Sequence, residues 1–312
     1  NLSGSVYMDS VQVSLPAWTL TTPHSHLVAS LHLPWSVLES RSTDDMRVAI
    51  SGTIGNKDLE NSMHLVDASS AVPLLPPAPL QLELVAHGNL EHLQLLKGHA
   101  ALQGIASLDV DGNVLHLLPD TSRTDIPPMG GDMTFHLGMQ NMKPLLSRLG
   151  IADSTLHVPS GTTLHGRATF KGNDYQLAAK MKSLAGDADL VAATNVVSET
   201  YTASFLANAF PLPAFLPSMD ASSFSGFLTA EGQRYDMTVP NALMDIRAQV
   251  DSLRLAGIDL NNLTLAANIA QQHLDACFTA DNTALQGEGA LKGNFIAGYH
   301  FNLNALLDRC SL

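Results

Sequence analysis

Hydrophobic and polar residues alternate with a period of two over most of the chain. The alternation is clearest at residues 80–87, 175–181 and 263–269, and it returns at 274–280. Because successive side chains of a β-strand point to opposite faces, this period predicts strands with one apolar face and one polar face. Turn-forming residues separate the runs at short intervals, which is typical of all-β chains. We therefore predict an all-β fold built on an elongated, twisted and mainly antiparallel sheet.

The apolar side of the predicted sheet is aliphatic and carries no charge, whereas the other side is polar. Gln81 and Glu83 lie on the polar side of one strand, and Lys180 and Lys182 lie on that of another. Alternation alone favours the core of a closed β-sandwich on the apolar side. The shortage of aromatic residues and the resemblance described below favour one continuous groove instead, and this is the prediction that we adopt. The residues predicted to line the groove are Leu80, Leu82, Leu84, Leu177, Met181, Leu263, Leu265 and Phe278.

One short helix is predicted within this β pattern, at residues 143–149. Leucine and methionine residues follow helical spacing there, and Gly150 provides a stop. Residues 58–62 have the composition of a single helical turn. Very little other helix is expected.

The prolines and glycines between residues 119 and 131 would interrupt any regular element. They indicate either a hinge within one continuous domain or a border between two parts of the sheet. The chain is thus predicted to consist of three sections. Residues 1–118 form a β-groove section, residues 119–150 form a hinge with the short helix, and residues 151–312 form a second β-groove section.

The segment Asp111-Gly112-Asn113 predicts a tight hairpin turn between strands at 105–110 and 114–118. It also has the acidic character of a calcium loop. Such a loop needs a bidentate Glu six residues after the glycine, and Leu118 occupies that position. The hairpin is therefore the better interpretation.

The composition limits the classes of partner. Apolar residues make up 45% of the 312 residues, but aromatic residues only 5% and charged residues 14%, which is below the roughly 25% charged residues of average domains. The net charge is −13 with only 16 Lys and Arg. Nucleic acid is not expected as a partner, because phosphate binding along a strand needs a basic stripe.

No catalytic residue, metal site or cofactor is predicted. The 13 histidines are scattered, and no nucleophile, acid pair or ligand cluster has suitable spacing. Cys277 and Cys310 match no metal or redox spacing, so we expect buried or half-buried small side chains, with one disulfide as the alternative. No run reaches the roughly 18 apolar residues of a transmembrane helix, and no signal-like segment opens the chain. The sequence is therefore expected to be part of a longer protein.

A succession of glycine- and leucine-containing blocks is more specific than the composition. It includes Val158-Pro159-Ser160-Gly161 and later Ser223-Phe224-Ser225-Gly226, with Ile50-Ser51-Gly52-Thr53-Ile54 as an earlier recurring block. This succession resembles the AsmA-like superfamily, in particular the TamB family of translocation and assembly modules, in a form like that of Bacteroidetes. The remaining blocks lie at residues 164–170, 175–177, 183–190, 201–203, 210–217 and 230–232.

The resemblance implies a β-taco-like sheet whose apolar groove binds phospholipid acyl chains. It further implies a periplasmic protein that is anchored to the inner membrane through a segment outside this sequence. Such a protein would carry phospholipid between the inner and outer membranes and support outer-membrane protein assembly with an outer-membrane β-barrel partner.

Two other functions remain open at this stage. A structural or adhesive β-solenoid or β-sandwich, without lipid transport, would also contain repeated amphipathic strands, but a solenoid should show a fixed repeat. A glycan-binding or hydrolytic β domain would need exposed aromatic residues or two placed carboxylates. Trp18 and Trp35 are the only tryptophans, and both lie among expected strand residues.

Overall fold

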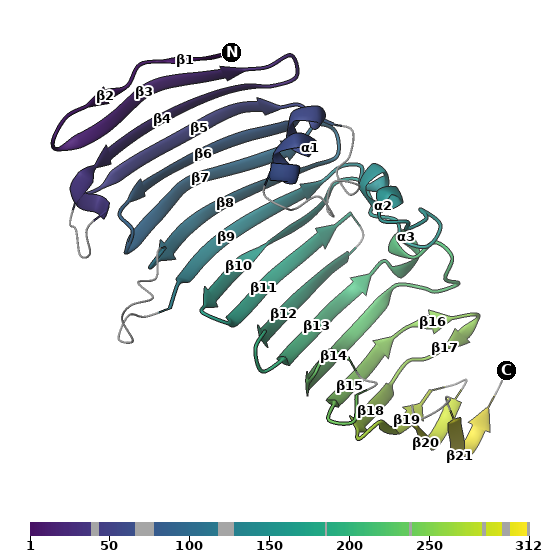
Figure 1. Ribbon diagram of the computed structural model, residues 1–312. Coiled ribbons are helices and arrows are strands. Elements are labelled where there is room, and N and C mark those ends of the chain that lie inside the picture. The colour runs from purple at the N-terminus through teal and green to yellow at the C-terminus, as the bar shows by residue number, and fades with distance from the viewer. Residues whose placement is uncertain are drawn as a thin grey trace. The chain divides into compact units, whose positions relative to one another are not determined.

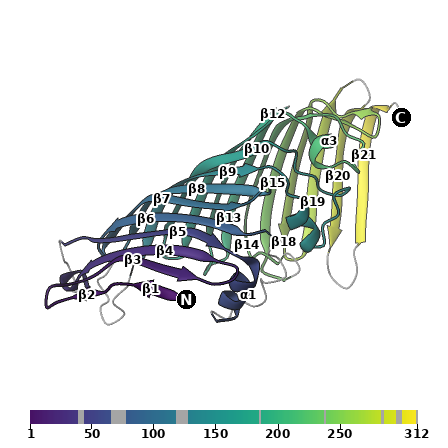
Figure 2. The same cartoon turned by 90° about the horizontal axis from the view of Figure 1, so that it is seen from above.

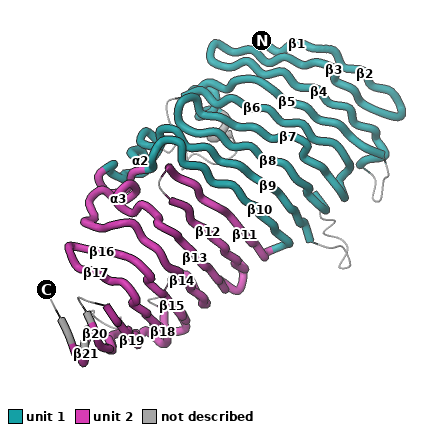
Figure 3. Tube along the Cα trace, turned by 180° about the vertical axis from the view of Figure 1, so that it is seen from behind, with its two compact units in different colours: residues 1–153, 158–172 teal, residues 154–157, 173–312 magenta. Residues whose placement is uncertain are grey.

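The computed structural model is all-β, as predicted, with antiparallel strands and a few short helices (Figure 1). The chain divides into two compact units, unit 1 at residues 1–153 and 158–172 and unit 2 at residues 154–157 and 173–312 (Figure 3). Each unit is described by itself below. The residues that the structure describes are 1–38, 44–65, 78–117, 128–184, 186–236, 239–282, 285–294 and 300–310.

Unit 1 contains an antiparallel meander in which strand order in space follows strand order in the chain. From β3 to β10 each strand pairs with the next, and the short β1 and β2 both pair with β3. The strands are β1 Leu2–Gly4, β2 Tyr7–Met8, β3 Gln12–Thr21, β4 His26–Pro34, β5 Met46–Ile54, β6 Leu80–Gly88, β7 His92–Leu102, β8 Ala106–Leu115, β9 Gly130–Met139 and β10 Thr162–Lys171.

Unit 2 repeats this plan. Each strand of its sheet pairs antiparallel with the next, and a separate hairpin of β16 and β17 stands between β15 and β18. The strands are β11 Asp174–Ser183, β12 Gly186–Asn195, β13 Thr200–Phe210, β14 Phe224–Gln233, β15 Leu243–Ser252, β16 Arg254–Leu255, β17 Ile258–Asp259, β18 Leu263–Ala270, β19 His273–Asp281, β20 Leu285–Asn294 and β21 His300–Cys310.

The predicted helix is present as α2, Lys143–Arg148, with Pro144 in its first turn, where proline costs no hydrogen bond. Its Leu146 is only 8% exposed. The remaining helical structure consists of α1 Asn56–Leu65, which includes the predicted turn at 58–62, α3 Leu212–Phe215 and a 3₁₀ helix at Trp35–Leu38. Among the described residues, no helix has the length and hydrophobicity required to cross a membrane.

A tertiary contact explains why α1 extends beyond the predicted single turn. The carboxylate of Asp58, in the first turn of α1, accepts hydrogen bonds from the hydroxyls of Thr22 and Ser25 in the β3–β4 turn. The Ser25 hydroxyl in turn accepts from the backbone N–H of Gly55 at 2.9 Å. Figures 1 and 2 show α1 beside the ends of the strands of unit 1. These bonds hold the start of α1 against the sheet.

Acidification is expected to release α1 from this turn. The hydrogen bonds from Ser25 and then Thr22 hold the pKa of Asp58 below its usual value of 3.8. Because the folded pKa is lowered, this contribution to stability is present above that usual value and is lost as pH falls through the folded pKa. The protection factors of the α1 amides, which compare their exchange rates with the intrinsic rates at the same pH, should therefore be high at about pH 7 and should fall as the pH is lowered through the depressed pKa of Asp58.

The matched variant for this experiment is Asp58→Asn, which removes the ionisable group. Its α1 amides should have low protection factors both at neutral pH and at acid pH. Equal protection of α1 in the parent at the two pH values would contradict the assignment of the contact to Asp58.

The predicted hairpin at Gly112 was wrong. Residues 106–115 form a single strand, and Gly112 lies inside it with φ of 151°. A Cβ atom at Gly112 would lie 2.2 Å from the carbonyl oxygen of Asp132 on β9. The glycine therefore allows the backbones of two neighbouring strands to approach closely within the sheet, and it does not form a turn.

The division between the units falls near residue 172, so that β9, α2 and β10 all belong to unit 1. Residues 119–127 of the predicted hinge lie outside the described residues. Cys277 is an exposed free thiol on the polar side of β19, so the expectation that it is buried or half-buried was wrong. The side chain of Cys310 lies outside the described part.

Candidate functional site

The residues predicted to line a groove in unit 1 share one face of its sheet. Leu82 lies directly between Gly52 on β5 and Ala100 on β7, and Leu84 lies between Ile50 and Gly98. Directly paired residues of antiparallel strands point to the same face. Following the register outward from Leu82 gives a row that crosses eight strands, namely Leu20, Leu27, Gly52, Leu82, Ala100, Leu108, Leu137 and Leu164.

The strand registers of β3–β10 show which residues lie on this apolar face of unit 1, and none of these residues is charged. Leu80, Leu82 and Leu84 are all half-buried on it. The most buried strand side chains of unit 1 lie on the same face and are Met46, Ala86 and Thr162. The face therefore keeps much of its aliphatic surface accessible, unlike the interior of a β-sandwich.

The predicted residues of unit 2 also share one face. Leu177 and Met181 lie on β11, across from Ala192 and Ala188 of β12. Leu265 of β18 lies directly across from Phe278 of β19. The registers from β11 to β19 connect these positions through a row formed by Leu177, Ala192, Ala203, Ala230, Ile246, Ala267 and Ala276.

The apolar face of unit 2 is as free of charge as that of unit 1. Leu177, Met181, Leu263 and Phe278 are half-buried, and Leu265 is 38% exposed. The structure thus describes two apolar faces, each within its own sheet. That the two sets of residues line one continuous groove stays a prediction.

Aromatic rings on these faces cover glycines on the neighbouring strand. Phe170 pairs with Gly131, and a Cβ atom at Gly131 would lie 2.3 Å from a ring carbon of Phe170. Phe278 has the same relation to Gly289, again at 2.3 Å. A ring in this position lies close to the backbone of the sheet. It therefore adds apolar surface area without projecting far from the face.

Charged side chains occupy the opposite face of both sheets, as predicted. Nζ of Lys97 forms an ion pair with the Glu83 carboxylate at 2.7 Å, and Nζ of Lys180 lies 3.3 Å from the Asp189 carboxylate. These pairs are exposed and contribute little to stability. They do show that the alternation separates charge from the apolar side completely along these strands.

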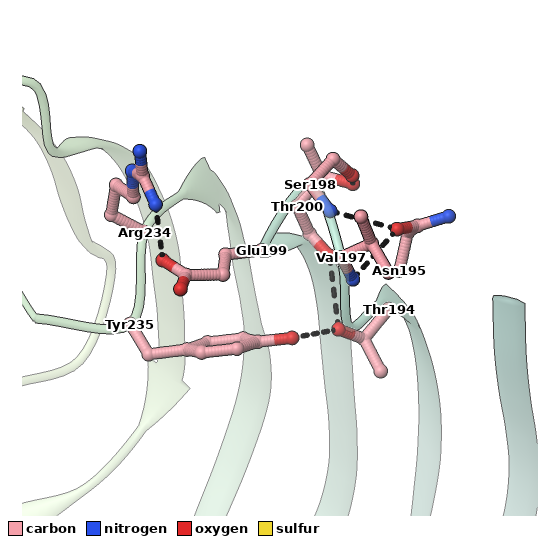
Figure 4. Close-up of polar contacts among 8 residues, drawn as sticks. All are labelled: Thr194, Asn195, Val197, Ser198, Glu199, Thr200, Arg234 and Tyr235. Atoms are coloured by element: carbon pink, nitrogen blue, oxygen red, sulfur yellow. Dashed lines mark hydrogen bonds and ion pairs between the residues drawn. The ribbon is translucent and has the colours of Figure 1, made fainter. Parts of the chain in front are cut away.

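One end of the apolar face in unit 2 carries hydroxyl groups that the pattern did not reveal. Tyr235, just after β14, stacks on Tyr201 with ring centroids 5.9 Å apart. Its hydroxyl lies 2.6 Å from Oγ1 of Thr194, which itself donates to the carbonyl of Thr200 (Figure 4). Burial raises the pKa of the Tyr201 hydroxyl above its usual value of 10.0. No sequence signal marks Tyr235, because it lies outside any strand.

The turns beyond this end are fixed by polar contacts (Figure 4). The side-chain oxygen of Asn195 accepts from the backbone N–H groups of Val197 and Ser198. Nη1 of Arg234 donates to Glu199 at 3.1 Å, and the Arg234 backbone N–H donates to the Glu199 carbonyl at 2.8 Å. The ends of β12, β13 and β14 are therefore held in register at this rim.

A phenylalanine cluster lies at the other end of β13. Phe210 stacks on Phe215 of α3 at 4.8 Å, and Phe205 stacks on Phe224 at 6.4 Å. Phe205 and Phe210 meet edge to face. Because Phe205 and Phe224 belong to the apolar face by register, α3 covers this end of it.

No group of three or more His, Cys, Asp or Glu side chains able to hold a metal ion occurs in the part of the chain that the structure describes. The arrangement instead offers two broad aliphatic surfaces backed by charge. Comparison with protein-family models found no match to this chain, and comparisons with curated proteins and with solved structures found none either.

Proposed function

We propose that this protein binds the acyl chains of phospholipids along the apolar faces of its two sheets and so carries phospholipid through the periplasm. The observation that carries the proposal is the charge-free aliphatic row that crosses eight strands in unit 1, with its counterpart in unit 2. Moving one methylene of a lipid tail from water to such a surface is favourable by about 0.8 kcal/mol. No polar recognition of the tail is required.

The chemistry of the face also supports a mobile ligand. Leucine, alanine and glycine dominate it, and the rings of Phe170 and Phe278 lie flat over glycines. A surface with few deep pockets and few directional bonds holds a tail without fixing it at one position. The hydroxyls near Tyr201 at the rim of unit 2 offer partners for the polar part of a lipid.

The resemblance to the AsmA-like superfamily supports the finer parts of this proposal. These are an inner-membrane anchor outside this sequence, transfer between inner and outer membranes, and an outer-membrane assembly partner. A structural or adhesive role without lipid is the competing function, and the same experiment separates the two.

Lipid analysis of the purified protein tests the proposal. The chain, produced in a Gram-negative periplasm and purified without detergent, is expected to retain phospholipid in native mass spectra. After delipidation it should bind a fluorescent phospholipid and transfer it between vesicles. Protein that is folded by circular dichroism but retains no lipid and binds none would favour the structural role.

A further inference from the structure

A hollow of about 550 Å³ lies in unit 1 against β3–β7, and most of its lining residues belong by register to the polar side of the sheet. The strand registers place Ser14, Ser30, His32, Arg47 and His87 of its lining on the polar side of the sheet. Two irregularities in the ladder border it. Pro16 lies in a register shift of β3, and Leu96 lies in one of β7, where it is 49% exposed. Such bulges re-aim side chains and often occur beside functional sites.

Three basic side chains form a cross-strand row in this hollow. His32 on β4 is the direct partner of Arg47 on β5, and Arg47 is the direct partner of His87 on β6. Directly opposed side chains lie about 5 Å apart at Cβ. The row therefore brings the imidazole of His32, the guanidinium of Arg47 and the imidazole of His87 to one wall of the hollow.

Two of these groups lack a protein partner. Among the described residues the side chain of Arg47 has no ion pair or hydrogen bond, whereas Arg167 and Lys97 on the same side of the sheet pair with Asp132 and Glu83. Nδ1 of His87 is buried without a hydrogen-bond partner. A buried polar nitrogen without a partner is costly, and in a native structure such a group calls for an explanation such as an ordered water or ion.

We propose that this hollow binds a phosphate group, held by the guanidinium of Arg47 between the imidazoles of His32 and His87. The arginine fork donates two parallel hydrogen bonds to an oxyanion, and donors on either side suit the remaining oxygens of a tetrahedral group better than a planar carboxylate. The hydroxyls of Ser14 and Ser30 add donors at the same wall. The proposal does not rest on acyl-chain binding, because it concerns the other side of the sheet.

The charges around Arg47 set the net charge of the hollow. The Glu83–Lys97 pair is internally neutral at 2.7 Å, and Asp45, just before the strand, precedes Arg47 by two residues. Removing the Asp45 carboxylate should therefore strengthen the binding of an anion. The titratable and basic groups on the polar side of β4–β7 are His26, His32, Arg47, Glu83, His87, His92, Lys97 and His99.

Titration of the full chain with inorganic phosphate, followed by calorimetry or ³¹P NMR, tests the site. Arg47→Gln is expected to weaken phosphate binding at least about tenfold, whereas the matched variant Arg167→Gln, on the same side of the sheet but outside the hollow, should leave it within about twofold. The double variant His32→Asn with His87→Asn should also weaken phosphate binding. Asp45→Asn should tighten binding.

The source of the phosphate group is distinguished by competition. Displacement of bound phosphate by short-chain phosphatidic acid below its micelle concentration, but not by glycerol 3-phosphate, would identify a lipid headgroup; equal displacement by both would identify a soluble phosphate compound. Either result supports the site. Undiminished phosphate binding by a folded Arg47→Gln protein, or equal losses in Arg47→Gln and Arg167→Gln, would overturn it, whatever the outcome for acyl chains.

Discussion

Leu177→Asp is expected to weaken binding of a fluorescent phospholipid at least about tenfold, because a carboxylate on the acyl-chain surface is desolvated by the bound tail. Leu177 is half-buried on the apolar face of β11. Its neighbour Ala178 is exposed on the opposite face, across from Val191. The matched change Ala178→Asp adds the same charge one residue away and should leave binding within about twofold.

A second pair of variants on another strand repeats this comparison. Leu265→Asp lies on the apolar face of β18 and Ala266→Asp on the polar face. Leu265 is 38% exposed, so its replacement should be tolerated by the fold more readily than that of Leu177. Circular dichroism and urea unfolding identify variants that retain the sheet. Parental phospholipid binding by folded Leu177→Asp and Leu265→Asp proteins would show that the tails do not contact these faces.

Gly112→Ala is expected to lower the free energy of unfolding of unit 1 by about 2–4 kcal/mol. The new Cβ atom would lie 2.2 Å from the Asp132 carbonyl oxygen, and alanine rarely adopts a φ of 151°. Backbone atoms on both strands would have to separate, and the hydrogen-bond ladder between β8 and β9 would weaken with them. Urea unfolding measures the loss.

Gly138→Ala is the control for this change. Gly138 lies on β9, the strand next to β8, where a Cβ atom would lie 3.2 Å from the Ser107 hydroxyl oxygen. That hydroxyl can rotate away, so the cost should stay below about 1 kcal/mol. If both alanine variants unfold at the same urea concentration, the close backbone approach at Gly112 is not a determinant of stability.

Alternation alone predicted which residues share a face. Leu80, Leu82 and Leu84 occupy one side of β6, and the charged partners Glu83 and Lys97 occupy the other. This succeeds because the two-residue period is a property of strand geometry and depends on no distant contact. The same reasoning placed Leu265 and Phe278 on the apolar side, and the strand register then pairs them directly.

Features that depend on distant residues were not predictable. Gly112 in an Asp-Gly-Asn segment has the local signature of a turn, and only the approach of Asp132 explains it as a strand residue. The helix α1 needed the hydroxyls of Thr22 and Ser25, far from Asp58 in the sequence. The histidine–arginine row across β4, β5 and β6 appears only once the strand registers align His32, Arg47 and His87.

The meander has a consequence for how such a protein can change in size. Because each strand from β4 to β9 pairs with its two neighbours in the chain, inserting or deleting one hairpin among them leaves the other pairings intact. Each added hairpin would lengthen the sheet by about 10 Å, since strands stand roughly 4.8 Å apart. The distance that such a sheet covers is therefore set by how many hairpins its gene encodes, and evolution can adjust it in uniform steps.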